Sequence, residues 1–351
     1  MNLIFPTDRL PYAFGEPLAT GGLRERVADF VVDELLDLKL AGEGEHAYLQ
    51  IKKTDINTRD VVHKLGRLAG VRERSIGYSG LKDRHAIATQ WFSVHLPGKP
   101  DPDWQSLLDT KIELLQVARH TRKLRRAEHR ANRFSLTIRG IATAEHAEIV
   151  ERLTVIGSHG VPNYFGEQRF GNAGDNVYQA LRMFQGERKV AKGWLRNMLL
   201  ASARSFIFNE VVGARVQRGD WHQLIEGDVM IIPGEDRLLG DEELNCSLVD
   251  AHAQGLIDSS AILWGRGELR TSGVARKIEE DVVGRYAELA AGLEAAGLSQ
   301  QRRPMRLRPA GLEWQVNEDN LVLTFELPVG AYATSLVREV VQTNNNRMAA
   351  A

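Results

Sequence analysis

The chain has 351 residues, more than a single hydrophobic core usually organises, so we expect two domains. Charged residues make up 26% and the net charge is −1, which excludes a uniformly basic nucleic-acid binder but leaves room for a local basic surface. A single cysteine, Cys246, excludes an intramolecular disulfide and a cysteine-rich zinc site.

The first 140 residues predict mixed α and β structure. In residues 46–53, Ala47, Leu49 and Ile51 alternate with polar or aromatic residues, which is typical of a strand buried on one face. Residues 57–70 predict a short helix that begins at Asn57 or Thr58 and stops at a glycine. Strand alternation returns in three further segments: 91–96, 134–139 and 321–327.

The middle of the chain predicts helices. Between residues 176 and 219, apolar side chains recur at steps of three and four, which places them on one helix face: Leu195, Met198, Leu199, Ala203, Phe206 and Ile207. Residues 227–240 predict a small hairpin, and residues 275–297 predict helix again. Since strand-rich segments flank this block, we interpret it as an insertion into one α+β domain.

Several motifs of common enzymes are absent from the sequence. It contains no phosphate-binding loop of nucleotide hydrolases, no glycine-rich dinucleotide fingerprint, no H-E-x-x-H and no G-x-S-x-G. The ten histidines show no spacing that favours a metal site. No apolar run is long enough to span a membrane, and the N-terminus lacks a signal-peptide pattern. We therefore expect no cofactor, no metal and a cytoplasmic location.

Basic residues concentrate in residues 119–133, where seven cations face the single acid Glu128, a net charge of +6. A solvated helix face would normally interleave acids with bases, so this pattern favours contact with a nucleic-acid backbone. The cations are Arg119, Arg122, Lys123, Arg125, Arg126, Arg130 and Arg133. A second basic patch, residues 301–309, would extend the same surface.

A short polar run precedes the strand predicted near residue 91. It contains one acid, Asp83, among Lys82, Arg84 and His85. An isolated aspartate in a loop usually caps a turn. Neighbouring cations, with Arg24 as a further candidate, would instead keep the carboxylate ionised, as a nucleophile requires.

Four segments decide between these alternatives: "SGLKDRHAIATQW", "RANRFSLTIRG", "GVPNYFGEQRFG" and "LPVGAYATSLVREVV". Their sequence and order resemble the tRNA pseudouridine synthase D family, from about residue 20 to residue 340. The resemblance implies an enzyme that isomerises uridine to pseudouridine in tRNA, at position 13 of the D arm, without a cofactor. It identifies Asp83 as the nucleophile, which attacks either C1′ of the ribose or C6 of the base.

The resemblance also implies the fold. It predicts an α+β pseudouridine synthase domain with a mixed, largely antiparallel sheet, formed by residues 1–159 and 308–351 and ending in a disordered tail. A helix-rich, family-specific insertion of residues 160–307 would leave an RNA-binding cleft beside it.

Roles for further residues follow from the same resemblance. Arg24 would pair with the nucleophile, although lysine is common there. The uridine pocket would be lined by Phe30, Asn132, Phe134 and Tyr332, where phenylalanine is common at the last position. Contacts to the RNA backbone are predicted for Lys82, Arg84, His85, Arg122, Lys123, Arg125, Arg126 and Arg169.

Two other functions compete with this interpretation: a non-catalytic RNA-binding or RNA-folding protein, and a glycosylase that releases uracil. The expected partner is tRNA. A glycosylase would differ from an isomerase in that its reaction would end in hydrolysis and free uracil. No membrane association and no protein partner are expected, and a monomer is predicted.

Overall fold

A computed structural model describes residues 9–171, 174–233, 237–239 and 246–344. The chain forms two compact units. The sheet unit contains Leu18–Leu153, Pro309–Gly330 and Val340–Ala351, and the helical unit contains Met1–Pro17, Thr154–Arg308 and Ala331–Glu339.

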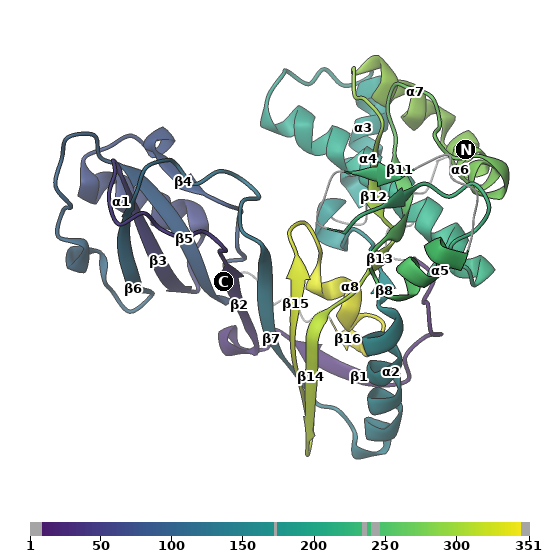
Figure 1. The fold of residues 1–351 in the computed structure, drawn as a ribbon, viewed down its shortest axis with the longest axis horizontal. Helices are drawn as coiled ribbons and strands as arrows, with labels where there is room; N and C mark the ends of the chain where they lie inside the picture. The colour runs from purple at the N-terminus through teal and green to yellow at the C-terminus, as the bar shows by residue number, and fades with distance from the viewer. Residues whose placement is uncertain (1–8, 172–173, 234–236, 240–245, 345–351) are drawn as a thin grey trace. The chain divides into compact units, whose positions relative to one another are not determined.

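The sheet unit is built on a mixed, largely antiparallel sheet, which confirms the predicted fold class (Figure 1). Its main path runs β14-β15-β7-β2-β5-β3-β6, with β1, β16 and β4 attached to it. The strands are β1 Thr20–Leu23, β2 Phe30–Leu35, β3 His46–Thr54, β4 Ile76–Tyr78, β5 Ile87–His95, β6 Ile112–His120, β7 Ala131–Arg139, β14 Ala310–Asn317, β15 Asn320–Pro328 and β16 Gln342–Asn344. Only β2–β5 and β1–β16 pair in parallel among the described strands.

The register of the strands brings one row of side chains across this sheet. Lys53 on β3 pairs with Ala88 on β5, which pairs with Val32 on β2. Val32 in turn pairs with Phe134 on β7, and Phe134 with Phe325 on β15. Because directly paired residues point to the same face of a sheet, these five side chains share one face, which we call the site face.

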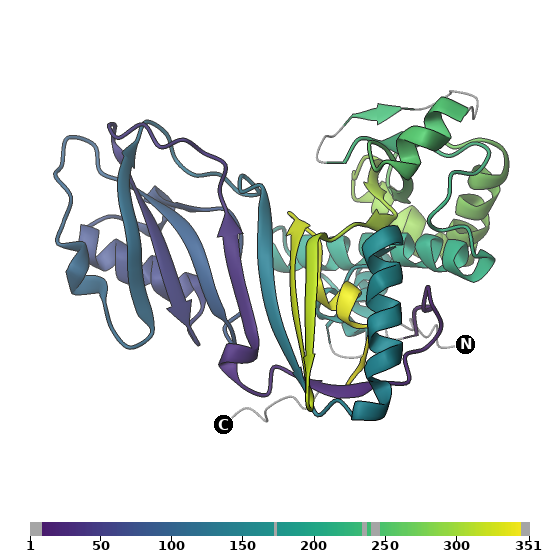
Figure 2. The ribbon, with the colours of Figure 1, turned by 60° about the horizontal axis from the view of Figure 1, so that its bottom comes forward.

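Helix α1 (Thr58–Ala69) covers the site face over β3 and β5, as Figures 1 and 2 show. The buried side of the helix carries Val61, Val62 and Leu65. These side chains pack against the same face of the sheet as Ile51. The helix begins after Asn57 and ends at Gly70, whose φ of 60° suits the left-handed conformation that glycine adopts without strain. Both predicted ends of this helix are therefore confirmed.

The prediction that the strand at residues 46–53 is buried on one face only was wrong. Tyr48 is fully buried on the face opposite to Ile51, where it packs with Trp91 and Leu124. The segment between β6 and β7 brings Leu124 over this second face, so β3 is covered on both sides.

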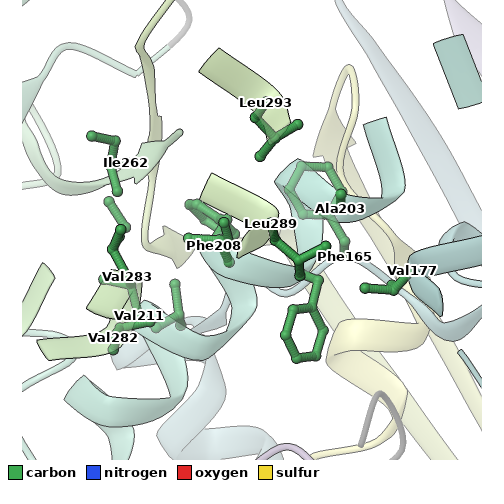
Figure 3. Packing of buried hydrophobic residues seen from close by; sticks show 14 of the residues in the cluster. Phe165, Val177, Ala203, Phe208, Val211, Ile262, Val282, Val283, Leu289 and Leu293 are labelled. Atoms are coloured by element: carbon green, nitrogen blue, oxygen red, sulfur yellow. The ribbon is translucent and has the colours of Figure 1, made fainter. Parts of the chain in front are cut away.

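The helical unit has its own hydrophobic core, centred on the long helix α4 (Figure 3). Phe165, Ala203, Phe208 and Leu289 lie in this core. The helices are α3 Asp175–Phe184, α4 Trp194–Arg218, α5 Cys246–Ala253, α6 Gly273–Arg285, α7 Ala287–Ala295 and α8 Ala333–Val337, while α2 (His146–His159) continues from the sheet unit. On α4 the predicted apolar face is buried except at its start, where Leu195 is 36% exposed.

The helical unit also contains strands, of which the sequence predicted only the pair in the hairpin at residues 227–240. Strands β9 (Met230–Ile231), β10 (Leu238–Leu239), β11 (Asp258–Leu263) and β12 (Gln301–Pro304) form one sheet, and β8 (Val161–Pro162) pairs with β13 (Arg306–Leu307). Strands β9 and β10 pair antiparallel and confirm the predicted hairpin as far as its residues are described. The helix predicted at 275–297 is two helices, which meet at Tyr286.

The patch at residues 301–309 was wrongly predicted to form a basic surface. Arg302 pairs with Glu279 and Arg306 pairs with Asp258, and the exposed fraction of each of these four side chains is 3 to 5%. Strands β12 and β13 place these arginines inside the unit, where acids from other elements neutralise them.

The compact units divide the chain at different residues from the predicted domains, whose boundaries stay a prediction. The helical unit takes Thr154–Arg308, where we expected 160–307, and it adds residues up to Pro17 and Ala331–Glu339. The tail predicted to be disordered, "NNNRMAA", begins at Asn344, which instead ends strand β16 and pairs with Gly22; the rest of the tail lies outside the described residues.

Candidate active site

Asp83 lies in the loop that joins β4 to β5 and forms an ion pair with Arg24. The distance from Arg24 Nη2 to Asp83 Oδ2 is 2.7 Å. The Asp83 side chain is 42% exposed, so a paired carboxylate still faces solvent. This is the arrangement of a carboxylate that is held in place and can be approached by a substrate.

The backbone of Arg24 is in an unusual conformation. Its φ of 66° lies in the left-handed region, which a residue with a side chain seldom adopts. The guanidinium carbon lies 3.9 Å from the centroid of the Phe30 ring, within reach of a cation–π interaction. The ring and the carboxylate together fix the guanidinium, and strain of this kind is common at functional sites.

Lys53, on strand β3, holds the Asp83 loop through its side chain. Its side chain is fully buried, and its ammonium donates hydrogen bonds of 2.7 Å to the carbonyl oxygens of Asp83 and Ile56. Burial lowers the pKa of Lys53 to about 8, while the charge of Asp83 acts in the opposite direction. A buried cation thus holds the main chain of the candidate nucleophile.

Lys82, next to Asp83, points into the protein and pairs with Glu34 at 3.1 Å. The side chains of Lys82 and Glu34 are 7% and 0% exposed. Burial raises the pKa of Glu34 and lowers the pKa of Lys82. Lys82 also donates a hydrogen bond to Oδ1 of Asn132, which faces Glu34 across β2 and β7.

The contact with Lys82 determines the orientation of the Asn132 amide. An ammonium group has donors and no acceptor, so the amide must turn its oxygen toward Lys82. The Nδ2 group of Asn132 is then left to donate a hydrogen bond elsewhere.

The rest of the loop is held by buried polar side chains. The Lys82 amide donates to Thr58 Oγ1 at 3.0 Å, and Gln90 Nε2 donates to the Gly80 carbonyl at 2.5 Å. Ser79 Oγ accepts from the amides of Glu128 and His129 at 2.8 and 3.0 Å. These contacts hold the part of the loop that precedes Asp83.

Three aromatic rings lie beside these groups on the site face. The centroids of Phe30 and Phe134 are 6.0 Å apart with the rings edge to face, and those of Phe134 and Phe325 are 5.5 Å apart with the rings stacked. Phe134 is only 8% exposed. A base that stacked on Phe134 would therefore meet a small exposed part of a ring that its neighbours already hold.

Arg84 and His85 face a different acid. Their side chains lie 3.6 and 3.2 Å from Asp55 Oδ1, and Lys111 approaches the same carboxylate at 3.4 Å. The Arg84 and His85 side chains are 55% and 64% exposed. Of the cations expected to neutralise Asp83, only Arg24 pairs with its carboxylate among the described residues.

The basic stretch 119–133 divides into paired and unpaired cations. Arg130 and Arg133 both pair with Glu326, and Arg122 pairs with Glu128. Arg125 and Arg126 are exposed, and within the described part of the chain no acid or carbonyl receives their guanidinium groups.

Two predicted site residues belong to the helical unit. The ring of Tyr332 lies 6.0 Å from that of Phe165, and the guanidinium carbon of Arg169 lies 5.3 Å from the Phe165 centroid. Gly166 permits this packing, since a Cβ there would lie 3.1 Å from Thr334 Oγ1 and 3.5 Å from Tyr332. The roles of Tyr332 and Arg169 stay predictions.

Lys53 and Glu34 were missed in the sequence, although a signal for each was present. Lys53 continues the alternation of Ala47, Leu49 and Ile51, and Glu34 continues that of Phe30 and Val32. A charged residue in phase with a buried strand face is costly to bury, so it indicates a structural or catalytic pairing.

Among the residues that the structure describes, no cluster of three or more histidine, cysteine, aspartate or glutamate side chains is placed to bind a metal ion. In the same part of the chain, every helix is too short or too polar to cross a membrane.

Comparison with known proteins identifies the family. The profile of tRNA pseudouridine synthase D matches residues 7–192 and 176–340. The chain is 43% identical over 335 residues to tRNA pseudouridine synthase D of Aeromonas salmonicida, covering 95% of this chain and 94% of that protein. It is 44% identical over 337 residues to that of Nitrosococcus oceani, with 95% and 94% coverage.

A solved structure has the same fold at low sequence identity. The crystal structure of the putative tRNA pseudouridine synthase D of Methanosarcina mazei matches with a TM-score of 0.74 at 20% identity, covering 96% of each chain. The extent of these matches means that this chain belongs to the tRNA pseudouridine synthase D family.

Proposed function

We propose that Asp83 is the nucleophile with which this tRNA pseudouridine synthase isomerises uridine to pseudouridine. The observation that carries the proposal is an exposed carboxylate whose side chain is held by Arg24 and whose main chain is held by Lys53. The reaction detaches uracil from the ribose C1′, turns it and rejoins it through C5. A carboxylate that adds to C1′ or C6 and later leaves divides this change into easier steps.

Arg24 and Lys53 serve Asp83 in different ways. The guanidinium of Arg24 stabilises the ionised carboxylate and fixes the direction of the attacking oxygens. The Lys53 ammonium donates a hydrogen bond to the main-chain carbonyl of Asp83 and so fixes the position of the loop relative to the sheet. Both are consistent with catalysis by a positioned group.

Asn132 reads the uracil edge in this proposal. Because Lys82 occupies Oδ1, the Nδ2 group donates, and the carbonyl oxygens of uracil accept such a bond. Cytosine has an amino group in place of the uracil O4. That amino group is a donor and could not accept a hydrogen bond from Asn132 Nδ2. Lys82 thereby acts from inside the protein, and its burial argues against the contact to the RNA backbone predicted for it.

Phe30 and Phe134 are proposed as apolar walls of the uridine pocket, and Tyr332 of the helical unit remains a candidate for contact with the uridine. A base inside a folded D arm must leave its stack to reach Asp83, and aromatic walls offset part of that cost. The small exposed fraction of Phe134 fits a wall better than a broad stacking platform. Arg84, His85 and Arg169 remain candidates for contact with the RNA backbone.

Position 13 of the D arm is proposed as the target uridine, and the enzyme is proposed to act as a monomer in the cytoplasm. The support for a monomer is that Asp83, Arg24, Lys53, Asn132 and Phe134 all come from one unit of one chain. Mapping pseudouridine in a tRNA transcript with and without uridine 13 tests the target, and light scattering of the purified protein tests the monomer.

The deciding experiment is Asp83→Asn, which removes the charge and keeps the shape. Tritium release from tRNA labelled at C5 of uridine should fall by more than about 1,000-fold, while tRNA affinity stays within a few-fold. The control is Asp55→Asn, a nearby aspartate that pairs with Arg84 and Lys111 and should keep most activity. Substantial turnover by Asp83→Asn would remove Asp83 from its role, and release of free uracil by the wild type would show a glycosylase.

A further inference from the structure

A basic hollow in the sheet unit is not explained by the Asp83 site. Its volume is about 580 Å³, and it lies between the first turn of α1, strand β4 and the segment that joins β6 to β7. We call it the α1 groove. Its charged lining residues are Arg59, Glu73, Arg74, Lys123, Arg125 and Arg126.

The charges of the α1 groove do not neutralise one another. Five cations face one acid, and the carboxylate of that acid, Glu73, already lies 3.2 Å from His63 Nδ1. Within the described residues, the guanidinium groups of four arginines make no hydrogen bond or ion pair: Arg59, Arg74, Arg125 and Arg126. Unpaired like charges around one hollow repel each other, and a polyanion relieves that repulsion.

The walls of the groove are fixed before any ligand arrives. Gly77 lets the segment after β6 lie directly on β4, because a Cβ there would come within 2.4 Å of the Leu124 carbonyl. The Leu124 amide donates to Ser93 Oγ at 2.9 Å, and Lys123 Nζ donates to the Arg74 carbonyl at 2.7 Å. The Ala127 amide donates to the Ser79 carbonyl at 2.7 Å. Arg125 and Arg126 therefore project from a held segment.

The residues that line the groove are neighbours in sequence of the Asp83 loop and of a residue that holds it. Tyr78 lines the groove, and the chain runs from it through Ser79 to Asp83 within five residues. At the other wall, Arg59 follows Thr58, whose Oγ1 accepts the amide of Lys82. A nucleotide beside one bound at Asp83 would thus reach the groove through neighbouring residues of the same unit.

We propose that the α1 groove binds the sugar–phosphate backbone of the RNA next to the target uridine. Arginine suits this ligand because its planar fork donates two parallel hydrogen bonds to a phosphate. Arg59 and Arg74 enter the site from outside the basic stretch, so the groove is defined by the fold and not by one run of sequence. The proposal rests on tRNA being the substrate.

The test compares two double variants that each remove two positive charges from the same stretch. Arg125→Gln with Arg126→Gln removes unpaired groove arginines, and Arg130→Gln with Arg133→Gln removes arginines already paired with Glu326. The groove variant should bind tRNA about 10-fold more weakly at 0.15 M salt and lower the slope of log affinity against log salt by one to two. The variant at Arg130 and Arg133 should change this slope by less than half as much as the groove variant does.

A second groove variant, Arg59→Gln with Arg74→Gln, should behave like the first, although its residues lie far from the stretch in sequence. Single-turnover rates at saturating enzyme separate a loss of tRNA affinity in both groove variants from a loss of chemistry at Asp83. A D-arm stem-loop used in place of tRNA should show the same loss of slope, since the bound backbone lies next to the target.

Three results would overturn the proposal. Unchanged affinity and slope in both groove variants would make the groove an ordinary solvated surface, and activity in the same assay would leave the proposed function standing. A slope that falls with tRNA but not with the stem-loop would place the contact away from the target uridine. Competition by poly-glutamate as effective as competition by RNA would indicate an acidic protein partner. Absence of pseudouridine with the wild type would reject the proposed function separately.

Discussion

The two arginine-rich segments of this chain use their charges in opposite ways. In residues 119–133, Arg125 and Arg126 are exposed at a hollow, and their guanidinium groups form no ion pair or hydrogen bond with any described residue. In residues 301–309, Arg302 and Arg306 lie inside the helical unit, each against a buried acid. A run of arginines is therefore a surface for a ligand in one place and part of a core in the other.

The difference follows from the partners that the fold supplies. Arg306 Nε lies 2.6 Å from Asp258 Oδ1, and Arg303 places its guanidinium carbon 4.3 Å from the Phe165 ring. Such contacts satisfy a buried cation, and removing one partner leaves the other charged and desolvated. Replacing an exposed arginine costs the protein little stability, and it lowers function only where the arginine binds a ligand.

The largest effect is expected from a substitution in the buried segment, residues 301–309, on the free energy of unfolding. Arg306→Met should lower the free energy of unfolding by about 3–5 kcal/mol, because Asp258 keeps its burial and loses its cation. Urea unfolding of the purified protein measures this. Arg306→Met with Asp258→Asn should recover a large part of the loss. A loss below about 1 kcal/mol in the single variant would show that the buried pair is not what distinguishes the segments.

Lys53 provides a sharper case, a buried cation that serves the active site. Lys53→Met should lower the isomerisation rate about 100-fold, since a small displacement of a positioned group has effects of that size, and leave tRNA affinity nearly unchanged. The control is Lys52→Met, whose exposed lysine pairs with Glu113 at 3.3 Å and should have little effect.

The pH dependence separates positioning by Lys53 from a merely structural role. Lys53 carries its charge below its pKa of about 8, so wild-type activity should fall as pH rises through 8. That limb of the pH profile should be missing from the residual activity of Lys53→Met. A full pH limb in the variant would assign the titration to another group.

A buried histidine with a lowered pKa lies in the first segment, His129, and another contacts the second segment, His252, whose Nε2 lies 3.0 Å from Arg306 Nη2. Burial lowers the pKa of His129 to about 4, with Lys82 adding to it, and burial lowers that of His252 to about 3, with Arg306 adding to it. In the unfolded chain a histidine takes up its proton near pH 6.5, so acid favours unfolding below that pH.

Between pH 7 and pH 5, each of these histidines should therefore remove about 2 kcal/mol of stability. His129→Gln and His252→Gln should each reduce the difference in unfolding free energy between the two pH values by that amount. A difference that stays as large as that of the wild type in both variants would contradict the burial argument.

The smallest effect should come from freeing paired arginines on the exposed segment. Glu326→Gln removes the acid that pairs with Arg130 and Arg133, whose side chains are 49% and 53% exposed. The affinity for tRNA should rise a few-fold at low salt, with a slope steeper by about one. Titrations at several salt concentrations measure both. Unchanged binding would mean that only arginines at the α1 groove meet RNA.

Much of this protein could be predicted where the signal is local. The helix at α1 follows from its apolar period and from the glycine that ends it, and β7 and β15 follow from alternation. Asp83 stood out because three potential cations surround it in the chain, and the resemblance of four segments gave it a role. Tyr48 was assigned to the wrong environment because alternation alone does not show that a second layer covers the other face.

What the sequence determined by itself was the class of fold, the family and the acid at the centre of the site. The tertiary structure decided which charges are free. Glu279 and Asp258 are 23 and 48 residues away from the arginines they neutralise, and Lys53 meets the Asp83 carbonyl across 30 residues. Charge pattern along a chain carries no record of such partners, because burial and pairing depend on which strands and loops the fold brings together.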